Sequence, residues 1–237
     1  MRDLLYLSES KMGVLVPQLP GRVRDRLGLE AGLNAGVLSV KASMASDSRT
    51  SHISALDAVV KMIERKYGHR QRTEQGLAVG HWIDFDEEFR FGSAWPGGDG
   101  VRGHPVVEGL VYFAAAQYPE QPPFVLVGSS AHLLDRRRAT GDGTPESQQV
   151  GHYYVEAIRA YAHALQELPG HAALGYLPEL GAADRALLAV TLLCEREAPH
   201  SEEWTAPVRL AGVARILAVD NTGSILATPL YIEYASR

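Results

Sequence analysis

The residues best placed to do chemistry stand where a buried strand turns into a predicted helix. Residues 124–127 form a short apolar run, typical of a strand buried on both faces, and Gly128 then allows a tight turn with positive φ. Ser129 or Ser130 can cap the following helix, and His132 comes shortly after. Such a junction presents backbone N–H groups, two hydroxyls and an imidazole at one point, which suits an anion or a polarised carbonyl.

The two serines are predicted to cap the helix or bind an anion rather than to act as nucleophiles. A nucleophilic hydroxyl needs a base within hydrogen-bond reach and an acid that orients the base. The spacing also departs from the pattern Gly-x-Ser-x-Gly, because Ala131 and His132 follow the serines.

Positive charge and further hydroxyls extend the predicted site. Residues 136–138 are three arginines, which are suited to clamp a phosphate over the junction. Ser8 and Lys11 follow the first predicted strand in the spacing Ser-x-x-Lys, in which a lysine can take the serine proton when the serine starts a helix. The companion motifs of that chemistry are absent, so we predict a contribution to binding. The predicted ligand-binding residues are Gly128, Ser129, Ser130, His132, Arg136, Arg137, Ser8 and Lys11.

An acid–base site is the alternative, with catalytic candidates His81, Asp84, Asp86 and His132. Asp84 and Asp86 share one face of a predicted strand, and two close carboxylates can separate their pKa values or hold a divalent cation. Alternating acids are equally typical of a strand that faces solvent, and the sequence favours that interpretation. An enzyme of this kind predicts an apolar cavity lined by Trp82, Phe91 and Tyr112.

Composition restricts the function classes. The 237 residues hold 23 basic and 28 acidic side chains, and this mild negative charge argues against nucleic acid as the main partner. The only cysteine, Cys194, cannot form an internal disulfide, which fits a reducing cytoplasm. No signal peptide and no apolar run of membrane-spanning length is found. Without cysteine pairs, closely spaced histidines on a helix or a glycine-rich nucleotide motif, we expect neither metal nor cofactor.

The element pattern predicts one α+β domain over residues 1–237, with α/β as the runner-up. Strands are expected over residues 4–8 and 36–41, and the main helices over 51–68 and 148–167. Residues 77–127 are expected to form an antiparallel meander that begins with a hairpin turning at Glu87 and Glu88. A C-terminal hairpin is expected over 208–219 and 225–234, and Pro229 predicts either a bulge or a sheet edge in its last strand.

Several separate segments resemble an uncharacterised actinobacterial family, a domain of unknown function. The resemblance lies in residues 5–11, 16–20, 79–80, 111–113, 126–133 and 228–231. It implies a bacterial source and an association with defence or signalling genes, and it carries over no catalytic residue.

We therefore expect a cytoplasmic domain that binds a small anionic or nucleotide-like molecule. The rival is an enzyme of specialised metabolism that uses the acid–base residues above. The third interpretation is an oligomerisation module, which predicts a homodimer and an exposed apolar strip on the 148–167 helix or the last hairpin. Neither nucleic acid nor a membrane is expected as a partner.

Overall fold

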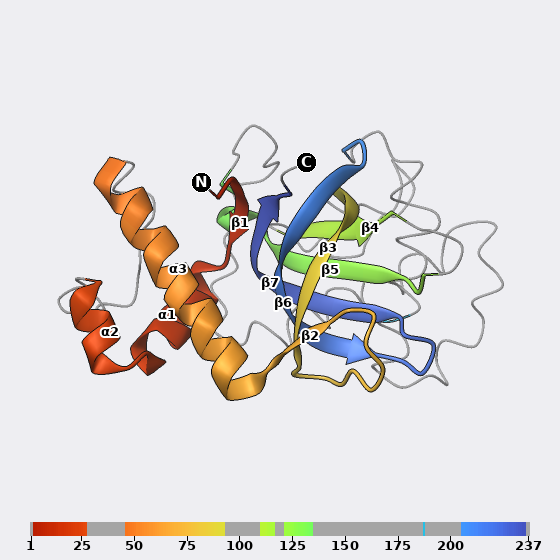
Figure 1. Cartoon of the computed structure of the whole chain (residues 1–237). Coiled ribbons are helices and arrows are strands. Elements are labelled where there is room, and N and C mark those ends of the chain that lie inside the picture. The colour runs from red at the N-terminus through yellow and green to blue at the C-terminus, as the bar shows by residue number, and fades with distance from the viewer. Residues whose placement is uncertain are drawn as a thin grey trace, which may run out of the picture.

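A computed structural model describes residues 2–27, 46–92, 110–116, 121–134, 187 and 205–235 (Figure 1). The expected strand at 36–41, the helix at 148–167 and the arginines Arg136 and Arg137 lie outside these ranges. The strands are β1 Leu4–Leu7, β2 His69–Gln71, β3 Trp82–Gly92, β4 Leu110–Ala115, β5 Phe124–Ser129, β6 Val208–Val219 and β7 Ile225–Tyr234. The helices are α1 Glu9–Leu15, α2 Gly21–Arg26 and α3 Ser46–Tyr67, with short 3-10 helices η1 Val16–Gln18 and η3 Ser130–His132.

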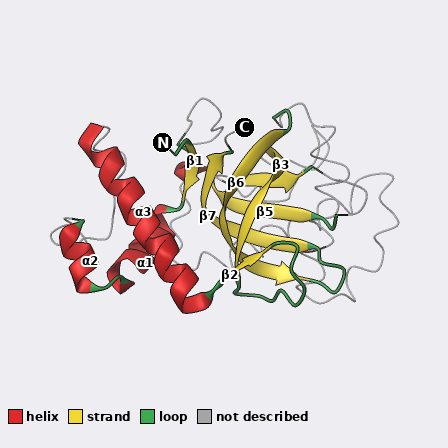
Figure 2. Cartoon of the chain, viewed as in Figure 1, coloured by secondary structure: helices red, strands yellow, loops and turns green. Residues whose placement is uncertain are grey.

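Five of the strands close into a barrel. β3 pairs antiparallel with β4 and β6, β4 pairs antiparallel with β5, and β6 pairs antiparallel with β7. The parallel pairing of β5 with β7 completes the ring, while β1 and β2 attach outside it to β7 and β3. Figure 2 shows α1, α2 and α3 gathered on one side of the strands. The chain is α+β as predicted, but its sheet is a closed barrel, which the sequence did not predict.

Aromatic side chains fill the barrel. Phe85 and Phe89 of β3 and Phe124 of β5 meet in edge-to-face contacts, with ring centroids 5.5 to 5.9 Å apart. All three rings are buried. Small barrels have interiors just wide enough for side chains to fill, and this cluster is the centre of that core.

A second core lies between the barrel and the helices. Leu56, Val59 and Ile63 of α3 are fully buried and pack in one cluster with Trp82 of β3 and Leu230 of β7. Their three-and-four spacing is the apolar stripe from which the 51–68 helix was predicted, so that prediction is confirmed. None of the helices in the described ranges is long and apolar enough to cross a membrane.

The predicted hairpin at residues 77–95 is wrong, because β3 runs unbroken through Glu87 and Glu88. Ile83, Phe85, Phe89 and Phe91 all belong to the barrel core, and Glu87 falls on the same alternating face. Glu87 and Glu88 do not form a turn, because the alternation of apolar side chains continues across them. No glycine, proline or asparagine interrupts the strand at this point.

The C-terminal hairpin is confirmed. The Asp220 carboxylate accepts hydrogen bonds from the backbone N–H groups of Thr222 and Ser224, and Gly223 takes a positive φ of 88°. Pairing shifts register near Pro229, which confirms the predicted bulge. The side chains of β7 are mostly buried, so this hairpin offers no exposed apolar strip for a partner in the described part of the chain.

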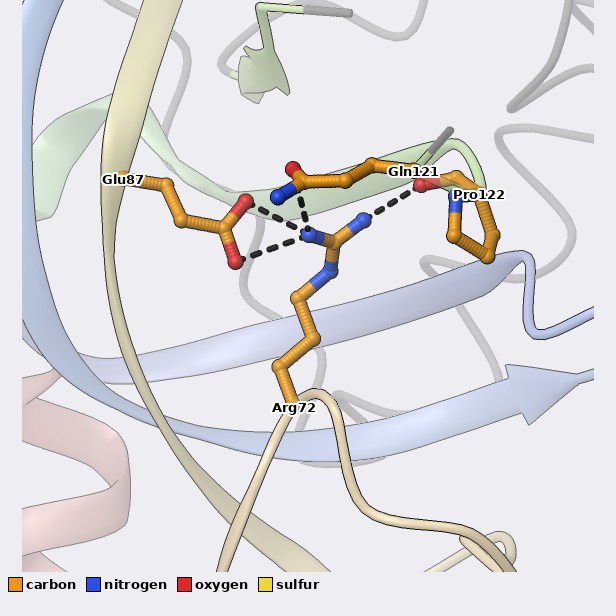
Figure 3. Close-up of polar contacts among 4 residues, drawn as sticks. All are labelled: Arg72, Glu87, Gln121 and Pro122. Atoms are coloured by element: carbon orange, nitrogen blue, oxygen red, sulfur yellow. Dashed lines mark hydrogen bonds and ion pairs between the residues drawn. The ribbon is translucent and has the colours of Figure 1, made fainter. Parts of the chain in front are cut away.

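The inward-facing Glu87 is matched by a buried arginine from the β2–β3 connection (Figure 3). Arg72 Nη1 donates to both carboxylate oxygens of Glu87, at 2.8 and 2.7 Å, and Nη2 donates to the carbonyl of Pro122. The guanidinium carbon lies 4.9 Å from the ring centroid of Phe124. Arg72 therefore ties the β2–β3 connection to β3 and to the start of β5 at one end of the barrel.

Removing one partner of this pair should destabilise the fold. Arg72→Met leaves the Glu87 carboxylate unpaired in a poorly solvated position, and we expect the free energy of unfolding to fall by about 3–5 kcal/mol. Urea unfolding measures it. Arg209→Met is the matched control, because the Arg209–Asp86 pair is 62% and 54% exposed and should contribute at most about 1 kcal/mol. Equal losses in the two variants would contradict the role assigned to Arg72.

Candidate functional site

The site forms at a gap along one edge of β7. β6 pairs with one edge of β7, while the other edge pairs with β5 at residues 225–227 and with β1 at residues 231–233. Between them, residues 228–230 have no strand beside them on that edge. The segment that follows β1 takes the place of a strand there, because the Ser8 N–H donates to the Leu230 carbonyl at 2.8 Å.

Ser8 starts helix α1, a helix that was not among the elements expected from the sequence. Its hydroxyl accepts the Lys11 N–H at 3.4 Å and lies 3.2 Å from the hydroxyl of Ser10. Ser8 is 1% exposed. The chain is helical from Glu9 to Leu15 and then forms η1.

Lys11 reaches from α1 into the gap. Its Nζ donates to Thr228 Oγ1 at 2.8 Å and to the Pro229 carbonyl at 2.9 Å, and lies 3.4 Å from Ser8 Oγ. All three partners are neutral. Within the described ranges, no carboxylate contacts Lys11.

Burial and a second cation lower the pKa of Lys11. Burial has the larger effect and repulsion by Arg215 adds to it, so that the pKa of Lys11 falls to about 7. Arg215 of β6 pairs directly with Thr228 of β7, and residues opposite each other on neighbouring strands share a face. Arg215 is exposed and donates to the Gly80 carbonyl at 3.3 Å. It forms no ion pair with any residue that the structure describes.

His132 and Tyr6 border the same cluster. The Tyr6 hydroxyl lies 3.2 Å from His132 Nδ1, and the tautomer of the ring sets the direction of this hydrogen bond. Burial, and then repulsion by Lys11, lower the pKa of His132 to about 4, so the ring is neutral at pH 7. Ser8, Lys11, His132, Arg215 and Thr228 together are called the Lys11 site below.

The junction after β5 differs from its prediction. Gly128 lies inside β5, outside the positive-φ region, and the space above it holds Tyr6: a Cβ on Gly128 would come 2.5 Å from the Tyr6 hydroxyl oxygen. The residue is needed for close packing rather than for a turn. After Ser129 the chain makes a 3-10 turn and not the predicted helix, because Leu133 then bridges to Tyr6 of the neighbouring β1.

The turn's backbone is largely occupied by contacts within the chain. Ser129 Oγ accepts the Ala131 N–H at 3.3 Å, the Leu133 N–H donates to the Ser130 carbonyl, and the Leu134 N–H donates to the Leu5 carbonyl. Ser129 and Ser130 are both buried. Side chains rather than these N–H groups are therefore the groups that can meet a ligand.

The structure brings together only part of the predicted binding set. Ser8, Lys11 and His132 belong to one cluster. Gly128, Ser129 and Ser130 precede His132 in the chain and are not part of it; both serines are buried. Thr228 and Arg215 were missed by the sequence reasoning. The one local signal was a polar threonine before Pro229 in an otherwise apolar strand.

The acid–base candidates do not converge. His81 Nδ1 accepts the Ala78 N–H, Asp84 pairs with His69 at 3.2 Å, and Asp86 pairs with Arg209. His132 contacts Tyr6 instead. Asp84 and Asp86 thus serve partly exposed ion pairs on the outer face of β3. Among the residues with described positions, no three His, Cys, Asp or Glu side chains are grouped to hold a metal ion.

The link between Lys11 and His132 is measurable. In Lys11→Met we expect the pKa of His132 to rise above about 4 but to stay below 6.5, because repulsion is removed while burial, the larger cause, remains. NMR titration of the His132 ring measures this, with Lys61→Met on the exposed face of α3 as the control. An unchanged pKa of His132 in Lys11→Met would show that the two groups are not coupled.

Comparison with known proteins extends over almost all of the chain. No curated protein and no solved structure matches it. A family described as a family of unknown function, DUF7019, matches residues 2–236. This confirms the resemblance to an uncharacterised family. The chain belongs to the DUF7019 family of unknown function.

Proposed function

We propose that the protein is a binding domain for a small anionic molecule, held at the Lys11 site. One observation carries the proposal: the Lys11 amine is enclosed by neutral acceptors and lies close enough to Arg215 to be repelled by it, and neither has a carboxylate partner in the described part of the chain. A buried cation without a counter-charge opposes folding. An anionic ligand supplies that counter-charge and makes charge-assisted hydrogen bonds.

The exposure of these residues is consistent with a site open to solvent. Arg215 is exposed, Lys11 and His132 are half-buried, and the hydroxyls of Ser8 and Thr228 lie deeper. An anionic group between Arg215 and Lys11 would meet both cations, while the neutral His132 ring offers a nitrogen to an uncharged part of the ligand. Arg136 and Arg137, which the sequence predicts to clamp a phosphate, lie outside the described residues and carry no part of this argument.

Stability should depend on pH through Lys11. The pKa of Lys11 is about 7 in the folded chain against an ordinary 10.5, so between these values the unfolded chain binds more protons. The contribution of Lys11 to the free energy of unfolding therefore rises from about pH 7 to about pH 10. Lys11→Met should be more stable than the wild type near pH 7, and this advantage should shrink as the pH rises.

Urea unfolding at several pH values between 7 and 10 measures this difference. Lys61→Met on α3 removes an exposed lysine and should follow the wild-type curve at all of them. A constant difference between Lys11→Met and the wild type across the range would mean that Lys11 keeps its ordinary pKa.

Anion binding should require protonated Lys11. Calorimetric titration with inorganic phosphate, acetate and adenosine monophosphate should detect binding of at least one, with uptake of about half a proton near pH 7, where Lys11 is half protonated. The affinity should fall as the pH rises above 7. Repeating the titration in buffers of different ionisation enthalpy measures the proton uptake.

Lys11→Met should weaken this binding at least tenfold, and Arg215→Met should weaken it too. Lys61→Met should bind as the wild type does. The proposal fails if none of the three anions binds at millimolar concentration, or if Lys11→Met binds them unchanged.

A further inference from the structure

The hydrogen bonds of the Lys11 side chain determine where the lone pair of its neutral amine can point. A neutral amine has two N–H donors and one lone pair. The two short contacts, to Thr228 Oγ1 and to the Pro229 carbonyl, account for both donors. The third and longest contact, at 3.4 Å, is to Ser8 Oγ, to which the protonated amine donates. Once the amine loses that proton, its lone pair can face this hydroxyl.

Ser8 can give its proton in that direction. Its oxygen already accepts the Lys11 backbone N–H, and Lys11 Nζ is the base within reach of the hydroxyl proton. The condition that the Ser-x-x-Lys spacing sets, a serine where a helix begins, is met by the start of α1. A serine activated by an adjacent base is the arrangement used in nucleophilic catalysis.

From this geometry we propose that Ser8 and Lys11 are a catalytic pair for acyl transfer, with Ser8 as nucleophile and Lys11 as general base. The substrate class is a carboxylic ester that carries a separate anionic group. The proposal rests on the proposed function for one of its two cations: Arg215 would hold the anionic group of the ester, whereas a free anion bound at Lys11 would keep the amine protonated and inhibit the reaction.

The step balances without a cofactor. Lys11 Nζ takes the Ser8 proton while Ser8 Oγ bonds to the ester carbonyl carbon. The bond from that carbon to the alcohol oxygen then breaks, and the Lys11 ammonium returns the proton to the departing alcohol. Water, deprotonated by Lys11, attacks the acyl–Ser8 ester, and the carboxylic acid leaves as Ser8 regains its proton.

Two neighbours define how the substrate must lie. An anion resting directly on Lys11 would keep the amine protonated and remove the base, so the anionic group belongs at the exposed Arg215, on the same face as Thr228. Ser8 is buried and Ser10 is exposed, with their hydroxyl oxygens 3.2 Å apart. Because Ser8 is buried, the ester can reach it only if neighbouring side chains such as that of Ser10 move.

The charged groups that face Lys11 are Arg215 from β6 and His132 from the turn after β5. His132 is already neutral in the pH range where Lys11 titrates. The rate of attack by Ser8 should therefore rise with pH through about 7, as Lys11 loses its proton.

The experiment uses the full chain with two reagents: the mono-4-nitrophenyl ester of glutaric acid, which is anionic, and a fluorophosphonate probe. We expect the protein to accelerate hydrolysis of this ester, relative to its rate without protein, more than it accelerates hydrolysis of neutral 4-nitrophenyl butyrate. The probe should label one site, which peptide mapping by mass spectrometry locates at Ser8. Lys11→Met and Lys11→Arg should each slow labelling by about 10²–10⁴-fold, because neither side chain can act as a base.

Further variants distinguish the loss of the Ser8–Lys11 catalytic pair from a general loss of structure. Ser8→Ala should lose labelling, and Ser10→Gly should label at least as fast as the wild type. Ser54→Ala on α3 is the control and should label normally. Circular dichroism establishes that each variant is folded.

Two results overturn the catalytic pair: no label on Ser8 in the wild type, or an unchanged labelling rate in both Lys11 variants. If phosphate, acetate or adenosine monophosphate still binds with proton uptake, the proposed binding function stands without the pair. If labelling and anion binding are both absent, both proposals fail.

Discussion

One edge of β7 is shared between two strands, and the rest of the structure depends on this arrangement. β5 takes one part of that edge to close the barrel, and β1 takes another to attach the helical side of the molecule. Buried backbone carbonyls need donors. Between the two strands, the Ser8 N–H and the Lys11 ammonium or amine provide them for Leu230 and Pro229. An ionisable group was drawn into a buried position because a strand could not continue there.

Local patterns predicted the elements better than their arrangement. The stripe on α3, the turn of the last hairpin and the bulge at Pro229 are each determined by neighbouring residues, and each was found. Glu87 was misread because its partner, Arg72, comes from another segment, so an inward-facing charge looked like a turn. Closure of the barrel could not be predicted, because the β5–β7 pairing joins segments about a hundred residues apart. Such a pairing produces no repeating pattern of residue types within either segment.

Part of the candidate site could be predicted from the sequence and part could not. The spacing of Ser8 and Lys11 was visible in the sequence, and so was His132, because each was found from its residue type and its nearby residues. What gives Lys11 its chemistry was not visible. Thr228, Pro229 and Arg215 lie more than two hundred residues away along the chain and share no motif with it. Ser-x-x-Lys alone could not indicate the site, because its other groups come from β6 and β7.

The distance along the chain between Lys11 and its acceptors affects when the Lys11 site can form during synthesis. The acceptors of Lys11 stand 217 and 218 residues after it in the chain. On the ribosome, Lys11 therefore remains an ordinary solvated and charged lysine while nearly all of the polypeptide is synthesised. Its amine loses charge only when β7 has emerged and docked beside β1. A nascent or truncated chain that lacks β7 has no Thr228 or Pro229 to bind this amine, so the lowered pKa of Lys11 belongs to the completed fold.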